Sequence, residues 1–163
     1  MSTVEDLLEE LRREKLATRR VLDRIPEASL AWKPHAKSMS LGQLALHTAG
    51  LPGGVAALLN APSSEVPNVP FPEAGSVSEI VAALEEQCAA AENILSSWED
   101  GSLRETFTWT MQGMALFQTS RPEQVRSVLF NHWYHHRGQL TVYLRLLDVP
   151  LPGIYGPSAD ERN

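Results

Sequence analysis

The sequence is short of cysteine, of basic residues and of long apolar runs. Its 163 residues contain one cysteine, Cys88, which excludes an intramolecular disulfide and a zinc site built from several cysteines. Lysine and arginine number 14 against 20 acidic residues, for a net charge of −6. This acidic balance argues against a general electrostatic attraction to nucleic acid or to an anionic membrane surface.

Signals for export or membrane insertion are also lacking. No segment reaches the roughly 20 apolar residues of a transmembrane helix. The N-terminus is acidic and amphipathic, whereas a secretory signal is basic and then apolar. We therefore expect a single cytoplasmic domain over residues 1–163, with neither a membrane nor a nucleic acid as partner.

Apolar periodicity predicts four helices. The segments 3–24, 40–59, 76–101 and 120–147 carry apolar residues at helical spacing, and the last three open with capping patterns at Ser40, Ser76 and Ser120. Pro52 should kink or break the second helix. Because four amphipathic helices must bury their apolar faces against one another, we expect an all-α four-helix bundle.

Two connections lie between these helices. The segment 60–75 is rich in proline and shows no periodicity, so it should be a loop. Residues 103–119 alternate threonine with aromatic residues and contain Gly113, which favours a short extended or hairpin segment between the third and fourth helices.

The most unusual feature is a cluster of three of the five histidines at 132–136. At about 100° per residue, His132 and His136 fall within about 40° of one another in the apolar stripe of the last predicted helix. Two histidines four residues apart on one face can bind the same divalent cation. His135 points about 100° away and should flank the site, while His35 lies in a polar connection.

His47 in the second predicted helix shares a face with Gln43 and Leu51 and should also face the bundle interior. Three inward histidines are costly to bury without partners, and one shared metal ion would satisfy them together. A set of three histidines without cysteine or carboxylate leaves coordination positions open, as in catalytic sites. The alternative is that these are hydrogen-bonded core histidines, which is the more common role of a single buried histidine.

Other residues near this set carry less specific patterns. Gln43 and Gln139 lie three or four residues from a histidine and could orient an imidazole or a bound water. Arg137 could bind an anionic substrate group. Cys88 falls in a buried row, where a free cysteine behaves as a small hydrophobe. Trp109, in the irregular segment, is the tryptophan most suited to line a site.

Two segments carry a recognisable pattern. Residues 131–145 read Asn-His-Trp-Tyr-His-His-Arg-Gly-Gln-Leu-Thr-Val-Tyr-Leu-Arg and are followed at 149–161 by a proline- and glycine-rich tail. Residues 41–47 read Leu-Gly-Gln-Leu-Ala-Leu-His. The first resembles the C-terminal signature of the DinB family, in the DinB/YfiT-like metalloprotein superfamily, and the second resembles its second-helix histidine motif. The resemblance spans nearly the whole chain, although residues 60–119 match only in arrangement.

The resemblance implies an up-down-down-up bundle, usually a homodimer, with a divalent metal held by His47, His132 and His136. Zinc or nickel is typical of such sites. Members of the superfamily include S-transferases that use low-molecular-weight thiols, a mycothiol-dependent maleylpyruvate isomerase, and stress-associated proteins with no assigned reaction. The tail at 150–161 could fold over a partner or over the mouth of the site.

Three functions remain open at this point. The first is a metal-dependent enzyme that activates water or an external thiol for hydrolysis, thiol transfer or isomerisation of a small-molecule substrate. The second is a non-catalytic, metal-binding stress-response protein in which the ion stabilises the bundle. The third is a bundle whose histidines bind no metal.

Overall fold

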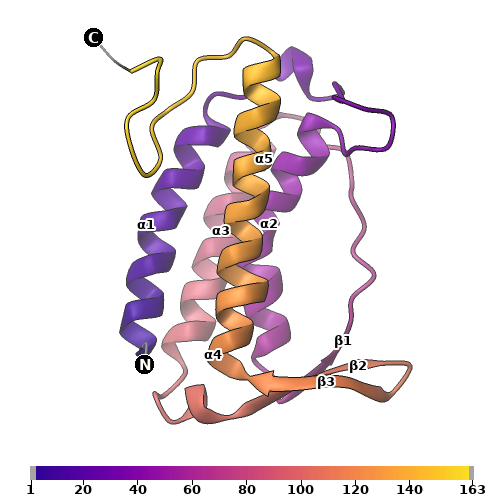
Figure 1. Cartoon of the computed structure of the whole chain (residues 1–163), viewed down its shortest axis with the longest axis vertical. Helices are drawn as coiled ribbons and strands as arrows, with labels where there is room; N and C mark the ends of the chain where they lie inside the picture. Colours follow the sequence, from indigo (N-terminus) through magenta and orange to yellow (C-terminus); the bar gives the residue numbers. More distant parts are fainter. Residues whose placement is uncertain (1–2, 162–163) are drawn as a thin grey trace.

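Four long helical columns lie side by side in the computed structural model, which describes residues 3–161 (Figure 1). The first three are α1 (Val4–Leu22), α2 (Leu41–Leu59) and α3 (Val77–Ser96). The last column joins α4 (Arg121–Gln124), a π-helical segment (Val125–Asn131) and α5 (His132–Leu146). In Figure 1, α1 runs upward, α2 and α3 run downward, and the last column runs upward. This is the predicted up-down-down-up order.

A small sheet lies at one end of the bundle, so the all-α prediction is wrong in this respect. β2 (Thr106–Met111) and β3 (Met114–Ser120) form an antiparallel pair, which confirms the predicted hairpin. β1 (Ser63–Glu65) pairs in parallel with β2, inside the segment that was expected to be only a loop. The Glu65 carboxylate accepts hydrogen bonds from the backbone N–H groups of Gln112 and Gly113, at 3.1 and 2.8 Å, and so fixes the hairpin turn.

The capping patterns are confirmed at two of the three predicted sites. Ser40 and Gln43 exchange side-chain and backbone hydrogen bonds at the start of α2, and the Ser76 hydroxyl accepts a bond from a backbone N–H at the start of α3. Ser120 makes no such bond, and the capping box predicted there is wrong. Pro122, in the first turn of α4, favours a helix start without it because its φ angle is already helical.

α2 continues as one helix through Pro52, so the break predicted there is wrong. Proline lacks the N–H that would bond to the carbonyl of Thr48, which costs the helix one hydrogen bond. Leu51, Pro52 and Gly53 are all buried, and α2 packs closely on α3 at this level. Burial of this apolar segment offsets the lost bond, so tertiary packing overrides the local preference.

α5 is buried on two sides. The side facing α2 carries the histidines, and the side facing α1 carries Trp133 and Arg137, which are 0 % and 3 % exposed. The Arg137 guanidinium lies 2.7 Å from the carboxylate of Glu14 in α1, which is itself 2 % exposed. Arg137 is therefore held by Glu14, and the expectation that it could bind a substrate beside the histidines is wrong.

The C-terminal tail folds back over α1 and α5. The Tyr155 hydroxyl donates a hydrogen bond of 2.8 Å to Glu14, and Asp160 lies 2.5 Å from Arg145. Arg145 holds the pKa of the Asp160 carboxyl at about 2, helped by a hydrogen bond from the backbone N–H of Leu151. The tail therefore lies on the side of α5 that faces away from the histidines. None of the helices within residues 3–161 is long and apolar enough to cross a membrane.

The close packing of α2 on α3 predicts that Gly53→Ala destabilises the protein by about 1–3 kcal/mol. A Cβ atom at Gly53 would lie 2.8 Å from the carbonyl oxygen of Gln87, so the two helices would have to separate. Gly54 is the matched control, because a Cβ there meets no atom within 4 Å. Gly54→Ala should stabilise the helix by about 0.5–1 kcal/mol. Equal free energies of unfolding for the two variants in urea would contradict this packing.

Candidate metal site

Three imidazoles from two helices converge near the middle of the bundle. His47 lies in the second turn of α2, and His132 and His136 lie in the first two turns of α5. One ring nitrogen from each comes within 4.8 Å of the others. The ring centroid of His47 is 4.6 Å from that of His136 and 5.6 Å from that of His132. The structure therefore brings the three predicted residues together.

The two α5 histidines are in direct contact with each other. The Nε2 atoms of His132 and His136 lie 2.8 Å apart. On the other side of the His136 ring, Nδ1 lies 2.7 Å from the amide oxygen Oε1 of Gln139. An amide oxygen accepts, so Nδ1 carries the proton and Nε2 of neutral His136 presents a lone pair. Gln139 thus orients the imidazole, as its spacing predicted.

His132, the second member of this pair, can donate to the first. The backbone carbonyl of Val128, in the π-helical segment one turn earlier, favours the protonated form of the His132 ring and partly opposes the effect of burial on its pKa. Without a metal ion, Nε2–H of neutral His132 can donate to the Nε2 lone pair of His136 at 2.8 Å. A cation bound by both nitrogens would take the place of that proton.

Partial burial favours the neutral form of these rings. The pKa of His47 is lowered from 6.5 to about 4, chiefly by burial and then by the nearby rings of His136 and His132. Burial is also the main cause of the lowered pKa values of His132 and His136, which the hydrogen bonds to Val128 and Gln139 partly oppose. Neutral imidazole is the form that binds a metal ion.

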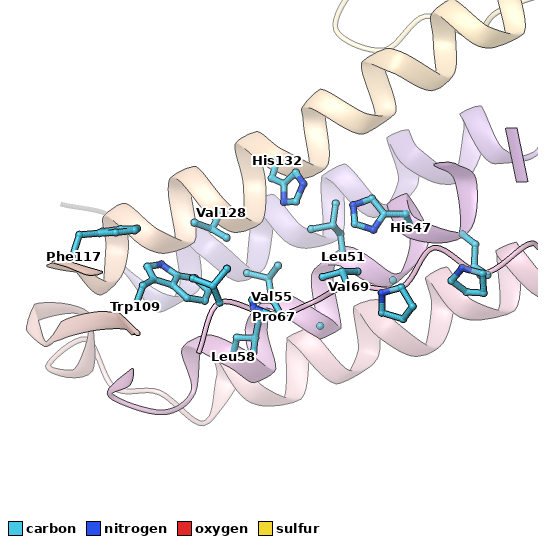
Figure 2. A pocket seen from close by; sticks show the side chains of 16 residues that line it. His47, Leu51, Val55, Leu58, Pro67, Val69, Trp109, Phe117, Val128 and His132 are labelled. Carbon is cyan, nitrogen blue, oxygen red and sulfur yellow. The ribbon is translucent and has the colours of Figure 1, made fainter. Parts of the chain in front are cut away.

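A cavity of about 810 Å³ opens beside two of the histidines, His47 and His132 (Figure 2). α2, the connection 66–72 and the sheet supply most of its walls. Trp109 lines it as predicted, with its indole N–H donated to the buried amide oxygen of Gln124 at 2.7 Å. An ion held by the three imidazoles would face this cavity on the side of His47 and His132.

The connection 66–72 is the part of the site that sequence reasoning missed. Gln43 does not orient a histidine; its side-chain amide donates to the backbone carbonyl of Phe71 at 2.8 Å and so attaches this connection to α2. The Phe71 ring then packs edge-on against His47, with 5.2 Å between the ring centroids. Proline content indicated only a loop there and carried no signal for its position.

The other candidates do not join the cluster. His135 is exposed and flanks the site as expected, with its ring centroid 5.0 Å from that of His136, and His35 is exposed. Cys88 is 2 % exposed in α3, and burial raises the pKa of its thiol to about 12. It therefore stays a protonated thiol at neutral pH, which confirms its predicted place in the core.

Comparison with known proteins places these features in a family. The DinB family profile matches residues 1–163. The uncharacterized protein YrdA of Bacillus subtilis strain 168 is 27% identical over 165 residues, which cover 98% of this chain and 92% of YrdA.

Two solved structures are similar in fold. A DinB-like protein of Bacillus cereus ATCC 10987 is 25% identical, with a TM-score of 0.71 over 94% of this chain and 98% of that one. The DinB-like protein YjoA of Bacillus subtilis is 16% identical, with a TM-score of 0.66 over 87% of this chain and 91% of that one. Both comparisons support the bundle architecture.

The lowered pKa of His47 predicts that the metal-free protein loses stability as the pH falls from about 6.5 towards 4. In this interval the unfolded chain, with a histidine pKa near 6.5, binds a proton that folded His47 does not. Above this interval the ring is neutral in both states and adds no pH dependence. Urea unfolding of EDTA-treated protein at several pH values measures the effect. His47→Gln lacks the titrating group and should show a smaller loss; an equal loss would contradict a buried neutral imidazole.

Proposed function

Because this chain belongs to the DinB family, we propose that it binds one divalent transition-metal ion through His47, His132 and His136 and uses that ion in a reaction on a small molecule. The observation that supports this most strongly is the convergence of one ring nitrogen from each histidine within 4.8 Å, with the Nε2 atoms of His132 and His136 2.8 Å apart. One cation would accept a lone pair from all three rings at once.

The donor set fits such an ion. Three neutral imidazoles suit zinc, nickel, copper or iron, and family resemblance favours zinc or nickel. Gln139 holds the ring of His136 from behind. Partners of this kind keep a ligating histidine in the correct tautomer and orientation. Within residues 3–161 no cysteine or carboxylate joins the cluster, so positions toward the cavity stay open to a ligand.

The residues around the histidines restrict which reactions the site could support. When bound, a divalent ion supplies Lewis acidity, which favours the deprotonated and nucleophilic form of water or a thiol at neutral pH. Cys88 does not supply that thiol, because it is buried in α3 and its pKa is raised to about 12. The nucleophile therefore comes from outside the chain. Thiol-dependent transfer or isomerisation and hydrolysis are the reaction classes that this site supports.

A non-catalytic metal-binding role in the stress response is the second candidate. The three histidines join α2 to α5, so an ion there would also crosslink two helices of the bundle. The homodimer and the cytoplasmic location stay predictions.

Metal content tests the ligand assignment. Protein purified without an affinity tag and reconstituted with zinc or nickel should hold about one equivalent per chain. We expect His47→Ala, His132→Ala and His136→Ala each to lose the ion. Gln139→Ala should weaken binding about 10–100-fold, since it removes only the group that orients His136. His135→Ala, on the exposed side of α5, is the control and should keep full occupancy. Occupancy of wild-type protein below a tenth of an equivalent would contradict the site.

A screen for thiol transfer and hydrolysis tests the catalytic proposal. An activity found with the metal-loaded protein should disappear after chelation, return with the ion, and be absent from His132→Ala. The His135→Ala protein should retain it. If metal-free His132→Ala retained every activity detected, the histidine site would have no part in catalysis and the enzymatic proposal would fail.

A further inference from the structure

The cavity beside His47 and His132 is almost free of polar groups. Sixteen residues line it, and none of them carries a charged side chain. Its polar side-chain atoms belong to the two imidazoles and to the indole of Trp109, whose N–H is already donated to Gln124. The other lining residues are aliphatic, proline, glycine or phenylalanine. The two histidines are therefore the polar end of an otherwise apolar cavity.

The backbone around the cavity is also poor in hydrogen-bond donors. Pro67, Pro70 and Pro72 form part of the connection that covers one side, and proline has no N–H group. The opposite wall is α2, whose N–H groups are used within the helix. A charged ligand group in this part of the cavity would lose its hydration without gaining a partner, which is energetically costly.

Two glycines leave room for a ligand body. Gly50 and Gly54 lie four residues apart on the face of α2 that lines the cavity, and a Cβ at either position would meet no atom within 4 Å. Glycine weakens a helix interior, yet here its lack of a side chain keeps the cavity wide. A volume of about 810 Å³ lies within the range of small-molecule sites.

Most of the labelled lining side chains lie on one side of the histidines. Figure 2 shows Leu51 and Val55 between His47 and the group formed by Leu58, Trp109 and Phe117, while unlabelled lining side chains lie beyond His47. A ligand with its end group at the imidazoles can place its body along α2 toward Trp109.

We propose that this cavity binds an uncharged molecule with an alkyl or aryl body and a single metal-binding group at one end. This inference rests on the proposed function, since the end group needs the ion held by the three histidines. A thiol built from amino acids carries carboxylate and ammonium groups that the apolar walls cannot pair. In a thiol-transfer reaction the cavity therefore holds the apolar partner, and a charged thiol approaches from the solvent side.

Three hydroxamates separate the contributions of the ion and the cavity. Acetohydroxamate has the metal-binding group alone, octanohydroxamate adds six methylenes, and suberic monohydroxamate has the same chain with a terminal carboxylate. Calorimetry with the metal-loaded protein should show affinity rising about two- to fourfold per added methylene. The terminal carboxylate should remove most of that gain, because it has no partner at the far end.

Gly54→Leu places a side chain in the cavity without a clash at Cβ. It should weaken octanohydroxamate at least about tenfold and leave acetohydroxamate unchanged. Gly138→Leu is the control, since Gly138 is exposed on α5, does not line the cavity and also has no atom within 4 Å of an added Cβ.

The outcomes distinguish the two proposals. If no hydroxamate binds the metal-treated protein, the metal site itself is refuted. If acetohydroxamate binds and chain length has no effect, the metal site stands and the apolar cavity is refuted as a ligand site. If chain length has no effect and Gly54→Leu also abolishes a dimer seen in light scattering, the cavity is a contact between two copies of the chain, and the ligand proposal is overturned.

Discussion

The approach of two imidazole nitrogens to 2.8 Å across one turn of α5 is the constraint on which the site depends. Oε1 of Gln139 holds the His136 ring from behind, so Nε2 of this ring directs its lone pair at His132. His47 from α2 brings a third ring nitrogen within 4.8 Å of these two. Three neutral nitrogens this close together suit one shared cation.

The rest of the bundle keeps these rings in place. On the other face of α5, the buried Arg137–Glu14 pair joins the helix to α1, and Tyr155 of the tail bonds to the same carboxylate. Removing one partner of a buried pair leaves an uncompensated charge, so this contact constrains how α5 lies against α1. The candidate metal site and the ion pair therefore lie on different faces of one helix. Ligands that are fixed before binding need less reorganisation when the ion arrives.

Local sequence patterns predicted the helices and the residues that share one face of a helix, because both depend only on neighbouring residues. The helix spacing of apolar residues identified the columns, and the rotation of about 100° per residue placed His132 and His136 on one face. The same argument placed His47 on an inward face of the second helix, in agreement with the family motif. It missed the burial of Arg137, because α5 packs against two neighbours and a single apolar stripe describes only one of them.

What the sequence could not predict depends on contacts between distant residues. β1 is the three-residue strand Ser-Ser-Glu, which has no apolar alternation and forms only because β2 offers an edge. Pro52 stays within α2 because α3 packs against it. The path of 66–72 beside His47 depends on the bond from Gln43 to Phe71, so the cavity wall follows from folding and not from its own composition.

Anomalous diffraction from a crystal of the zinc- or nickel-reconstituted protein tests the central claim most directly. Data collected on both sides of the metal absorption edge should show one peak per chain at about 2.0–2.1 Å from a ring nitrogen of each of His47, His132 and His136. A peak bound by the exposed His35 or His135, or no peak among the three clustered rings, would contradict it.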